Sequence, residues 1–315
     1  MKVIIIDALN MFLRSYVVVP SMDSKGRPFG GCIGFMKSLQ KLCREIKPDE
    51  IVVCWDGVGG SEKKKKLKKD YKSGRKPLRF NRRMIELPPE EQEKNKAYQQ
   101  LRLYTYLNEM PIIQISIDGV EADDVIAKVA RHKRYRKWEK IIVSSDKDFF
   151  QLCSKSTVVY RPIQNVTMTV EKLIEMDKIH PNNYALARAL VGDPSDNLPG
   201  IRGIGMKTVA KYFSILKEEA PQETYDIIKL CEEVEKPTKC HERILAEQKK
   251  FELNFDMMQL YRPMLTNRNI DTINYSVESF EPELNKFNIL KLLSEDGKAA
   301  LNLNTLYNCL RKIKR

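Results

Sequence analysis

Two aspartates at the end of a short apolar segment are the first residues in this sequence that suggest chemistry. Lys140 to Val143 is rich in β-branched residues and predicts a buried strand, and Asp146 and Asp148 follow it in SSDKDFFQL. One interpretation is a turn, because Asp often caps the N–H groups that follow a strand. The other is a pair of metal ligands. The other predicted strands help to choose between the two.

Acidic residues recur at the carboxyl ends of those strands. Asp7 ends KVIIID and Asp56 ends EIVVCWD, while the helix after PIIQIS opens with Glu121, Asp123 and Asp124. The carboxyl ends of parallel strands meet at one edge of a sheet, so all these carboxylates should crowd together there. Such a group repels itself unless cations lie among its members. Because all-oxygen ligands favour Mg²⁺ or Mn²⁺, we predict a shared metal site.

Single members of this acidic group have simpler interpretations. Asp7 alone fits a turn residue at a strand end, and so does Asp56, which precedes a glycine. Glu121 and Asp124 share a helix face at spacing i, i+3, whereas Asp123 points elsewhere on an ideal helix. One of these two aspartates is then only a partner of the helix dipole, unless the first turn is irregular.

Composition indicates a globular protein and argues against several kinds of site. Of 315 residues, 42% are hydrophobic and 31% are charged. No apolar run approaches the roughly 20 residues that span a bilayer, and MKVIIIDALNMF is too short for a signal peptide. Seven cysteines without C-x-x-C spacing, and only three histidines, argue against a disulfide framework, a zinc site or a Ser–His–Asp triad.

The charge of the chain favours a polyanionic partner. The formal net charge is +13, and twelve of the 23 residues from Ser61 to Arg83 are Lys or Arg. Such a run is often only a solvated or disordered tail. Here it lies between two segments with regular patterning and contains Tyr71 and Phe80, which suits a groove that tracks phosphates and stacks bases. Nucleic acid is therefore the expected partner.

The order of the predicted elements indicates two regions. Strands and helices alternate up to about residue 165, which is typical of a mostly parallel sheet with helices on both faces, and only helices are expected after it. We predict an α/β catalytic domain over residues 1–180, with a basic arch at about 57–95. A helical DNA-binding region is predicted over 181–315, with a glycine hairpin at 198–210 and a C-terminal helical extension. The expected strands are 2–7, 50–56, 111–116, 140–145 and 157–162, and the expected helices are 30–46, 89–110, 121–136, 169–176, 182–192 and 206–219.

A glycine-rich segment in the helical region forms a second signal. Gly200, Gly203 and Gly205 are followed by Lys207 and Thr208, which open a predicted helix. Glycines let a backbone approach its partner closely, and the free N–H groups at a helix start bind phosphate. No strand precedes the segment, which argues against a dinucleotide-binding fold. The pattern is that of a helix–hairpin–helix element, which holds the duplex backbone without reading bases.

Taken in order, the motifs resemble those of the flap endonuclease and 5′→3′ exonuclease family. They are I-D-x-x-N, C-W-D-G, G-V-E-A-D-D, S-S-D-K-D-F-F-Q-L and G-D-x-S-D-N-L-P-G-I-x-G-I-G-x-K-T, over about residues 1–215. The chain is similar to the 5′-nuclease domain of bacterial DNA polymerase I and to stand-alone bacteriophage 5′-nucleases. The resemblance implies a PIN-like 5′-nuclease fold with a helical arch and a helix–hairpin–helix (helix–three-turn–helix) region.

The resemblance also assigns metal ligands. It implies two ions, Mg²⁺ or Mn²⁺, that hydrolyse a phosphodiester bond. Asp193 and Asp196 have the spacing of simple caps, but they lead straight into the hairpin. The first implied cluster is Asp7, Asp56, Glu121 and Asp123 with Asp124 beside them, and the second is Asp146, Asp148 and Asp196 with Asp193 nearby.

The family's DNA contacts carry over to three segments. The stretch YKSGRKP resembles its arch-base motif, in which Tyr71 stacks on a base while Lys72 and Arg75 contact phosphates near the cut. Arg14 matches the arginine after the first motif. Lys76, Arg79 and the other basic residues line an arch over single-stranded DNA, and the hairpin holds the duplex and a K⁺ ion. Ala8 stands where the family has Gly, and we expect little effect from it.

The implied activity is structure-specific cleavage of DNA with 5′ flaps, nicks or free 5′ ends, with RNA–DNA hybrids and the removal of RNA primers included. We expect a cytoplasmic monomer of a bacterial or phage-infected cell that uses no membrane and works beside replication proteins. Two alternatives stay open. A PIN-like ribonuclease shares the acidic edge but lacks the glycine hairpin and YKSGRKP. A silent DNA-binding relative would be expected to lack acids in one cluster.

Overall fold

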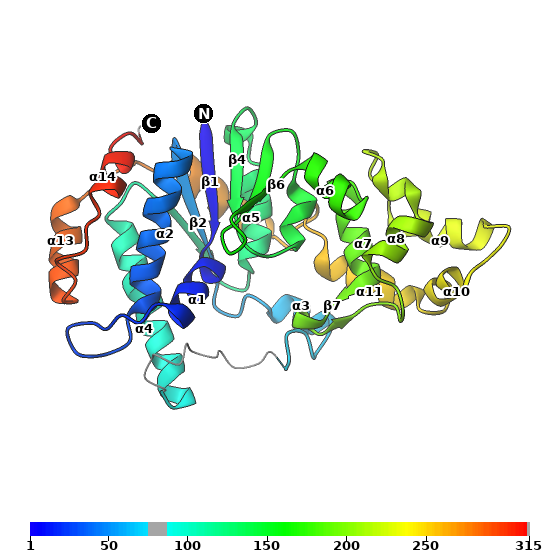
Figure 1. Ribbon diagram of the computed structural model, residues 1–315, viewed down its shortest axis with the longest axis horizontal. Helices are drawn as coiled ribbons and strands as arrows, with labels where there is room; N and C mark the ends of the chain where they lie inside the picture. The colour runs from blue at the N-terminus through cyan, green and yellow to red at the C-terminus, as the bar shows by residue number, and fades with distance from the viewer. Residues whose placement is uncertain (75–86, 314–315) are drawn as a thin grey trace.

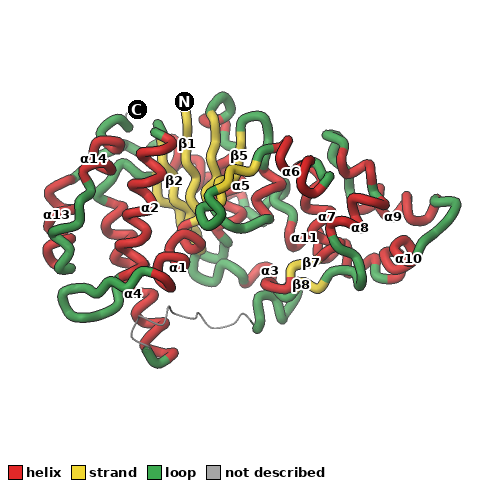
Figure 2. The backbone as a smooth tube through the Cα atoms, in the orientation of Figure 1, coloured by secondary structure: helices red, strands yellow, loops and turns green. Residues whose placement is uncertain are grey.

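The computed structural model describes residues 1–74 and 87–313, and a six-stranded sheet lies at its centre (Figure 1, Figure 2). The strand order is β3-β2-β1-β4-β5-β6, in which the first five are parallel and β6 runs antiparallel to β5. This confirms the predicted mostly parallel sheet. The strands are β1 (Lys2–Asp7), β2 (Glu50–Asp56), β3 (Ile113–Ile117), β4 (Glu139–Val143), β5 (Thr157–Arg161) and β6 (Val166–Met168).

Both faces of the sheet are buried, because successive side chains of a strand point to opposite sides. Val3 and Ile5 of β1 belong to one hydrophobic core, and Ile4 and Ile6 belong to the other. This double burial explains why β1 is a continuous apolar run. The first core is covered by α5 (Ala122–Ala130) and the second by α1 (Ala8–Val18), α2 (Gly30–Ile46) and α4 (Pro89–Asn108).

A group of helices extends from the β6 side of the sheet, to the right in Figure 1. They follow β6, the last strand of this sheet, but the short strands β7 (Gly192–Asp193) and β8 (Leu198–Pro199) come after α7, where the sequence predicts helices only. No helix within residues 1–74 and 87–313 is long and apolar enough to cross a bilayer. The helices are α6 (Val170–Asp177), α7 (Tyr184–Val191), α8 (Met206–Tyr212), α9 (Thr224–Glu233), α10 (Lys239–Ala246) and α11 (Gln248–Met258).

The last part of the chain returns to the sheet. Helix α12 (Asn267–Glu278) packs on β3 and α5, and α14 (Asn304–Leu310) packs on α2. Helix α13 (Lys286–Glu295) adds its buried side chains to the core that contains α2 and α4. The C-terminal residues therefore complete both faces of the sheet.

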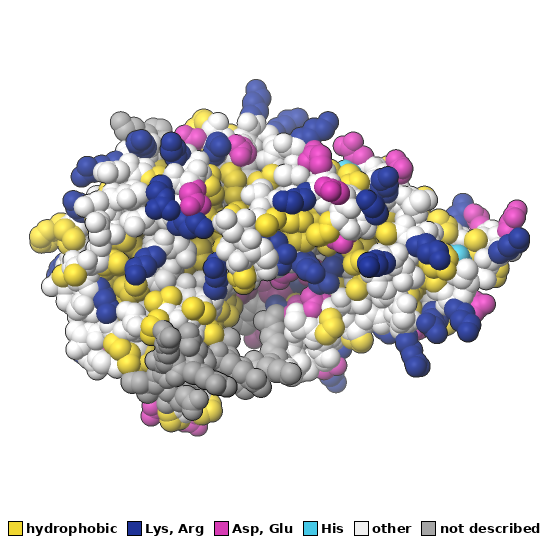
Figure 3. Space-filling model, in the orientation of Figure 1, with side chains coloured by type: hydrophobic (Ala, Val, Ile, Leu, Met, Phe, Trp, Pro, Cys, Tyr) yellow, Lys and Arg dark blue, Asp and Glu magenta, His cyan; other side chains and the backbone are white. Residues whose placement is uncertain are grey.

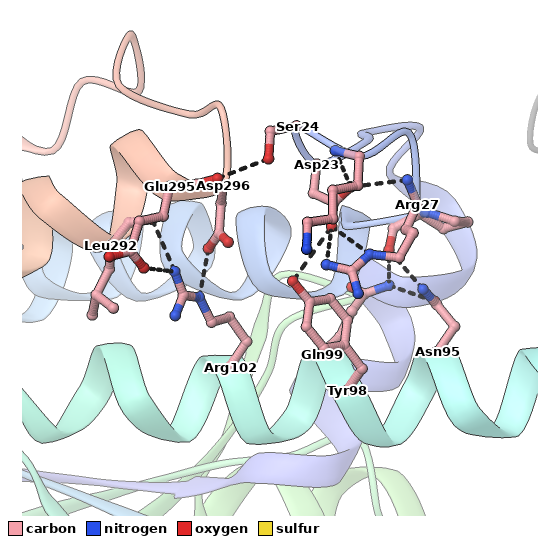
Figure 4. A network of polar contacts seen from close by, with 12 residues as sticks. Asp23, Ser24, Arg27, Asn95, Tyr98, Gln99, Arg102, Leu292, Glu295 and Asp296 are labelled. Atoms are coloured by element: carbon pink, nitrogen blue, oxygen red, sulfur yellow. Dashed lines mark hydrogen bonds and ion pairs between the residues drawn. The ribbon is translucent and has the colours of Figure 1, made fainter.

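A polar network fastens α13 to α4 (Figure 4). The Arg102 guanidinium on α4 pairs with Asp296 at 2.7 Å and with Glu295 at 2.9 Å. The Tyr106 hydroxyl donates to the same Asp296 carboxylate at 2.6 Å. Asp296 is 5% exposed, so the guanidinium balances a nearly buried charge. This contact positions α13 along α4, the helix that follows the predicted arch.

Three elements differ from the predicted ones. Strands do not end at residue 165, because β6 turns back on β5 through Asn165 in the left-handed conformation (φ 52°). Helix α5 ends at Ala130 rather than at 136, and the His132 side chain accepts from the Arg134 N–H of the short 3₁₀ turn that follows. Helix α8 likewise ends at Tyr212.

The predicted boundary at residue 180 stays a prediction. Residues from both sides of it, such as Ile179 and Tyr184, share one hydrophobic core. The helical region therefore continues the core of the sheet, and its last helices lie on the far side of that sheet.

The packing of α14 leads to a stability prediction. Leu306 is fully buried beneath α2, whereas Leu290 on α13 is 44% exposed. We expect Leu306→Ala to lower the free energy of unfolding by about 2–5 kcal/mol, because it removes buried methyl groups and leaves a cavity. Leu290→Ala should change it by less than about 1 kcal/mol. Urea unfolding of both variants measures the difference, and equal losses would mean that α14 contributes no core.

Candidate active site

The carboxyl ends of β1, β2 and β4 bring the predicted acids to one edge of the sheet, below the strands in Figure 1. A space-filling view shows acidic and basic side chains together in a hollow near this edge (Figure 3). Asp7 is one of the buried acids of this edge. Its carboxylate accepts from the Asn10 N–H at 3.1 Å and from the Ser144 hydroxyl at 2.9 Å. The Asn10 side chain in turn accepts from the Ser145 N–H at 3.1 Å, so the ends of β1 and β4 are tied together.

Asp7 carries a charge that its surroundings oppose. It is 7% exposed, and its pKa is raised to about 7, because burial and the charges of Asp56 and Asp146 outweigh the two hydrogen bonds. Asp56 ends β2 and is exposed. Its carboxylate accepts from the Ala122 N–H at 2.9 Å, which joins the end of β2 to the start of α5.

The acids after β4 are held by one arginine of the helical region. Arg188 on α7 donates from Nε to Asp148 at 3.0 Å and from Nη2 to Asp193 at 2.6 Å. Burial raises the pKa of Asp148 to about 7, and the charge of Asp146 adds to this rise while Arg188 opposes it. The pKa of Asp193 lies below its ordinary value because two hydrogen bonds from Ser195 and the Arg188 charge outweigh its partial burial.

Asp146 combines both interpretations of the sequence. Its carboxylate accepts from the Asp148 N–H at 2.8 Å, which is the local turn bond of the simpler interpretation. Burial also raises the pKa of Asp146, and the charges of Asp196 and Asp193 raise it further. The pair at 146 and 148 is therefore part of a turn and part of the acidic group.

Glu121 is the centre of a contact between the acidic edge and the predicted arch base. It is 3% exposed and pairs with Lys64 on α3 (Glu62–Leu67) at 2.7 Å and with Lys72. Burial alone would raise the pKa of Glu121, but the two lysines hold it below its ordinary value. The Tyr71 hydroxyl donates to Glu121 at 3.3 Å and to Asp196 at 3.0 Å.

The structure distinguishes the two aspartates of the first turn of α5. Asp124 is buried and accepts from the Met264 N–H at 3.0 Å, so it fixes a distant loop. Burial raises the pKa of Asp123 well above its ordinary value, and the charge of Asp146 raises it further. Asp123 therefore interacts electrostatically with the acidic group, whereas Asp124 has a structural partner in the Met264 loop.

The acidic group fits a divalent cation by its chemistry. Within the described ranges, no three His, Cys, Asp or Glu side chains are arranged to hold a metal ion as they lie. Several of these carboxylates have other partners, since lysines pair with Glu121, Arg188 pairs with Asp148 and Asp193, and the Met264 N–H donates to Asp124. The donors are nevertheless all oxygens, and burial raises the pKa of five of them. A cation would relieve this unfavourable charge. These five are Asp7, Asp123, Asp124, Asp146 and Asp148.

The arch base is folded against the acids. Tyr71 is 2% exposed and packs with Leu198 and two methionines of α11, so its ring does not face solvent. The Lys72 backbone N–H donates to the Asp196 carbonyl at 3.0 Å, and the residue is left-handed (φ 57°). Arg14 lies exposed on α1, on the first motif's helix. The predicted contacts Arg75, Lys76 and Arg79 lie outside the described residues.

The glycine hairpin connects β8 (Leu198–Pro199) to α8. Gly203 has a positive φ of 77°, and Gly205 precedes the first residue of α8. A Cβ on Gly200 would lie 2.0 Å from the Val191 carbonyl oxygen, so this glycine serves packing within the protein. Lys207 is exposed at the first turn of α8.

Thr208 stands at the same helix start, and its backbone N–H donates to the Gly205 carbonyl at 2.8 Å. The structure thus brings the hairpin residues to one turn.

Two site residues were missed by the sequence analysis, Lys64 and Arg188. Lys64 is 6% exposed although it stands in a run of four lysines, and nothing in such a run marks which member is buried. Arg188 lies within an otherwise apolar helix, NNYALARALVG, which is a signal that could have been used. A lone arginine on an apolar helix indicates a buried partner of opposite charge.

Comparison with known proteins places this arrangement in a family. Residues 2–179 match the family model described as 5′-3′ exonuclease, N-terminal resolvase-like domain. A 5′-3′ exonuclease of Aquifex aeolicus is 29% identical over 90% of this chain and 88% of its own length. DNA polymerase I of Thermus thermophilus is 31% identical over 82% of this chain. The matched region covers only 28% of that longer protein.

A solved structure agrees in fold. It is the flap endonuclease of bacteriophage T5 in complex with DNA and metal ions, which superposes with a TM-score of 0.66 at 18% identity and covers 93% of this chain and 100% of that chain. At this identity the likeness establishes the fold. Together with the matched family model, which spans more than half of the residues, it shows that the chain belongs to the 5′-3′ exonuclease family.

Proposed function

We propose that this protein is a metal-dependent, structure-specific 5′-nuclease that acts on DNA as a 5′→3′ exonuclease and flap endonuclease. The observation that carries the proposal is the partly buried acidic edge, in which the charges of Asp7, Asp146 and Asp148 gather at the carboxyl ends of β1 and β4. A purely structural cluster would not be kept at such a cost in desolvation. Membership of the family and the DNA and metal ions named for the T5 relative support the same activity.

The proposed cofactor is a pair of Mg²⁺ or Mn²⁺ ions. Asp7, Asp56, Glu121 and Asp123 would hold the first, with Asp124 as their support through the Met264 loop. The aspartates at 146, 148, 193 and 196 would hold the second. When bound, two such ions supply an activated water and stabilise the leaving oxygen of a phosphodiester.

The chain's own residues have separate tasks in this proposal. Ser144 and Asn10 orient Asp7 through their hydrogen bonds, and Arg188 keeps Asp148 and Asp193 in place. Lys72 now pairs with Glu121, and its ammonium would transfer to the phosphate at the cut. Tyr71 must leave its buried position before its ring can stack on a base. Arch-base movement on DNA binding is therefore part of the proposal.

The remaining parts of the proposal concern the substrate. The arch, including Arg75, Lys76 and Arg79, would guide single-stranded 5′ DNA toward the acids, with Arg14 on the same approach. The hairpin from Gly200 to Thr208 would hold the duplex by its backbone and bind K⁺ through carbonyl oxygens. Flaps, nicks, free 5′ ends and RNA–DNA hybrids are the proposed substrates of a monomer that acts in the cytoplasm beside replication proteins.

Replacing a carboxylate should separate chemistry from binding. We expect Asp146→Asn and Asp148→Asn to reduce single-turnover cleavage of a 5′-flap substrate in Mg²⁺ by several orders of magnitude. DNA affinity measured in Ca²⁺ should stay near wild type or tighten, because basic residues provide binding and the lost charge repelled the DNA. Cleavage by the wild type should vanish in EDTA.

The matched control for these variants is Asp118→Asn, since Asp118 is an exposed aspartate just after β3. It should cleave like the wild type. If the Asp146 and Asp148 variants lost DNA affinity as steeply as cleavage, these residues would hold the fold rather than metal.

The hairpin glycines should affect duplex binding alone. A Cβ at Gly205 meets no atom within 4 Å, so Gly205→Ala leaves the protein unstrained and would act only through closer approach to DNA. We expect Gly205→Ala and Gly203→Ala to weaken duplex affinity several-fold without changing Mg²⁺ affinity. In Gly203→Ala the Arg243 guanidinium, 2.5 Å from the added Cβ, must also shift. Gly26→Ala is the control, since Gly26 has a similar positive φ (74°) in open space away from the hairpin. Unchanged duplex affinity in both hairpin variants would count against this assignment.

The raised pKa values of the acidic group should be visible in the pH dependence of stability. The pKa values of Asp7 and Asp148 are raised from 3.8 to about 7, so the folded protein binds protons that the unfolded chain has released. Their stabilising contribution is fully present below pH 3.8 and is lost as the pH rises to about 7. In EDTA, Asp7→Asn should flatten this fall in the free energy of unfolding.

Divalent cations should reverse the same loss. We expect Mg²⁺ to raise the melting temperature more at pH 8 than at pH 5, because only ionised carboxylates bind it. Thermal unfolding with and without Mg²⁺ at the two pH values is the measurement. An equal effect at both would show that these carboxyls do not bind the ion.

A further inference from the structure

A cavity with a basic lining lies at the opposite end of the sheet from the acidic edge. It has a volume of about 500 Å³ and is lined by residues near the amino ends of β4 and β5, including Lys140 and Thr157. The predicted metal ligands follow the carboxyl ends of the strands. The cavity is therefore separate from the proposed nuclease site.

The lining of the cavity carries an excess of positive charge, although Lys133 and His132 lie beside Glu278. Of the residues that line it, Arg131, Lys133, Arg136 and Lys140 are basic and His132 adds an imidazole, whereas none of the described lining residues is acidic. Lys133 is paired with Glu278 at 2.8 Å outside the lining. Arg136 is exposed at the rim. The local charge thus favours an anion inside the cavity.

Lys140 places a buried positive charge beside the cavity. It is 4% exposed, and its ammonium donates to three neutral oxygens: the carbonyls of Tyr135 at 3.2 Å and Trp138 at 3.0 Å, and the Ser156 hydroxyl at 2.8 Å. These bonds satisfy its N–H groups and leave its charge unbalanced. Burial accordingly lowers the pKa of Lys140. An anion in the adjacent cavity would offset the cost of this buried charge.

We propose that this cavity binds a small phosphate-bearing ligand of the size of a nucleoside monophosphate. Arginine and lysine together favour the multiply charged oxygens of a phosphate group. The volume lies in the range of small-molecule pockets and exceeds what a bare ion needs. Asn182 and Ser154, which also line the cavity, supply neutral polar groups that suit a sugar or a base.

One lining residue connects the cavity to the acidic edge. The Gln151 amide donates to the Asp148 carbonyl at 2.8 Å and accepts from the Leu260 N–H at 2.7 Å. Arg131 donates to the Leu260 carbonyl. An occupant that moves Arg131 or Gln151 would therefore also affect the segment that carries Asp148. The proposal itself concerns binding alone.

Titration calorimetry of the full chain with dAMP in EDTA tests the proposal. EDTA keeps metal-bound nucleotide out of the proposed nuclease site. We expect saturable binding that becomes about tenfold weaker in Arg136→Gln and in Lys140→Met, since each removes one charged contact. Lys137→Gln, an exposed neighbour outside the lining, is the matched control and should bind like the wild type. Circular dichroism shows whether Lys140→Met is folded. If it is not, the Arg136→Gln variant still tests the proposal, because Arg136 is exposed.

Competition experiments identify the source of the phosphate. Displacement of dAMP by inorganic phosphate, at a similar concentration, assigns the site to the phosphate group alone and supports the proposal. No saturable dAMP binding, binding that is equal in Arg136→Gln, or binding only of a single-stranded oligonucleotide would overturn it. Flap cleavage by Arg136→Gln should remain at the wild-type rate, so failure of this proposal would be distinguishable from failure of the proposed nuclease activity.

Discussion

Repulsion among carboxylates that have been taken out of water is the constraint on which the rest of this structure depends. Asp7, Asp123, Asp146 and Asp148 gather at a partly buried edge, and burial with mutual repulsion raises the pKa of each. A sheet edge alone cannot tolerate this. The chain places cations against the group, and the elements that carry these cations are thereby fixed in position.

These cations come from distant parts of the sequence. Lys64 and Lys72 reach Glu121 from the segment between β2 and α4, and Arg188 reaches Asp148 from the helical region. Buried pairs of this kind add little net stability, but removing one partner is costly because an unpaired charge remains. The charge balance therefore determines how the arch base and α7 sit on the sheet. A divalent cation at the same acids would compete with the lysines, which links metal binding to the position of the arch base.

The sequence was sufficient to predict the sheet and the acidic edge. It was not sufficient to predict the cations, the loop and the helices that contact them. Strand ends could be read because β-branched runs such as Val3 to Ile6 stop at an acidic residue, and parallel strands align their ends. Whether Asp123 or Asp124 faces the group depends on the Met264 loop, 140 residues further on, which no local period reveals. Lys64 was hidden among identical neighbours. The return of α12 to α14 was also not predicted, because apolar spacing shows which face of a helix is buried but not against what.

That return has a consequence for how the protein folds as it is synthesised. Ile4 of the first strand shares a hydrophobic core with Leu306 and Leu310, nearly the whole length of the chain away. Contacts of such long separation are slow to form, and these cannot form until residues 306 to 310 have left the ribosome. A nascent chain must therefore hold an apolar face of β1 and α2 partly uncovered while the ribosome still works. Helix α14 thus covers this apolar face, and we expect ribosome-bound chains that lack α14 to depend on chaperones.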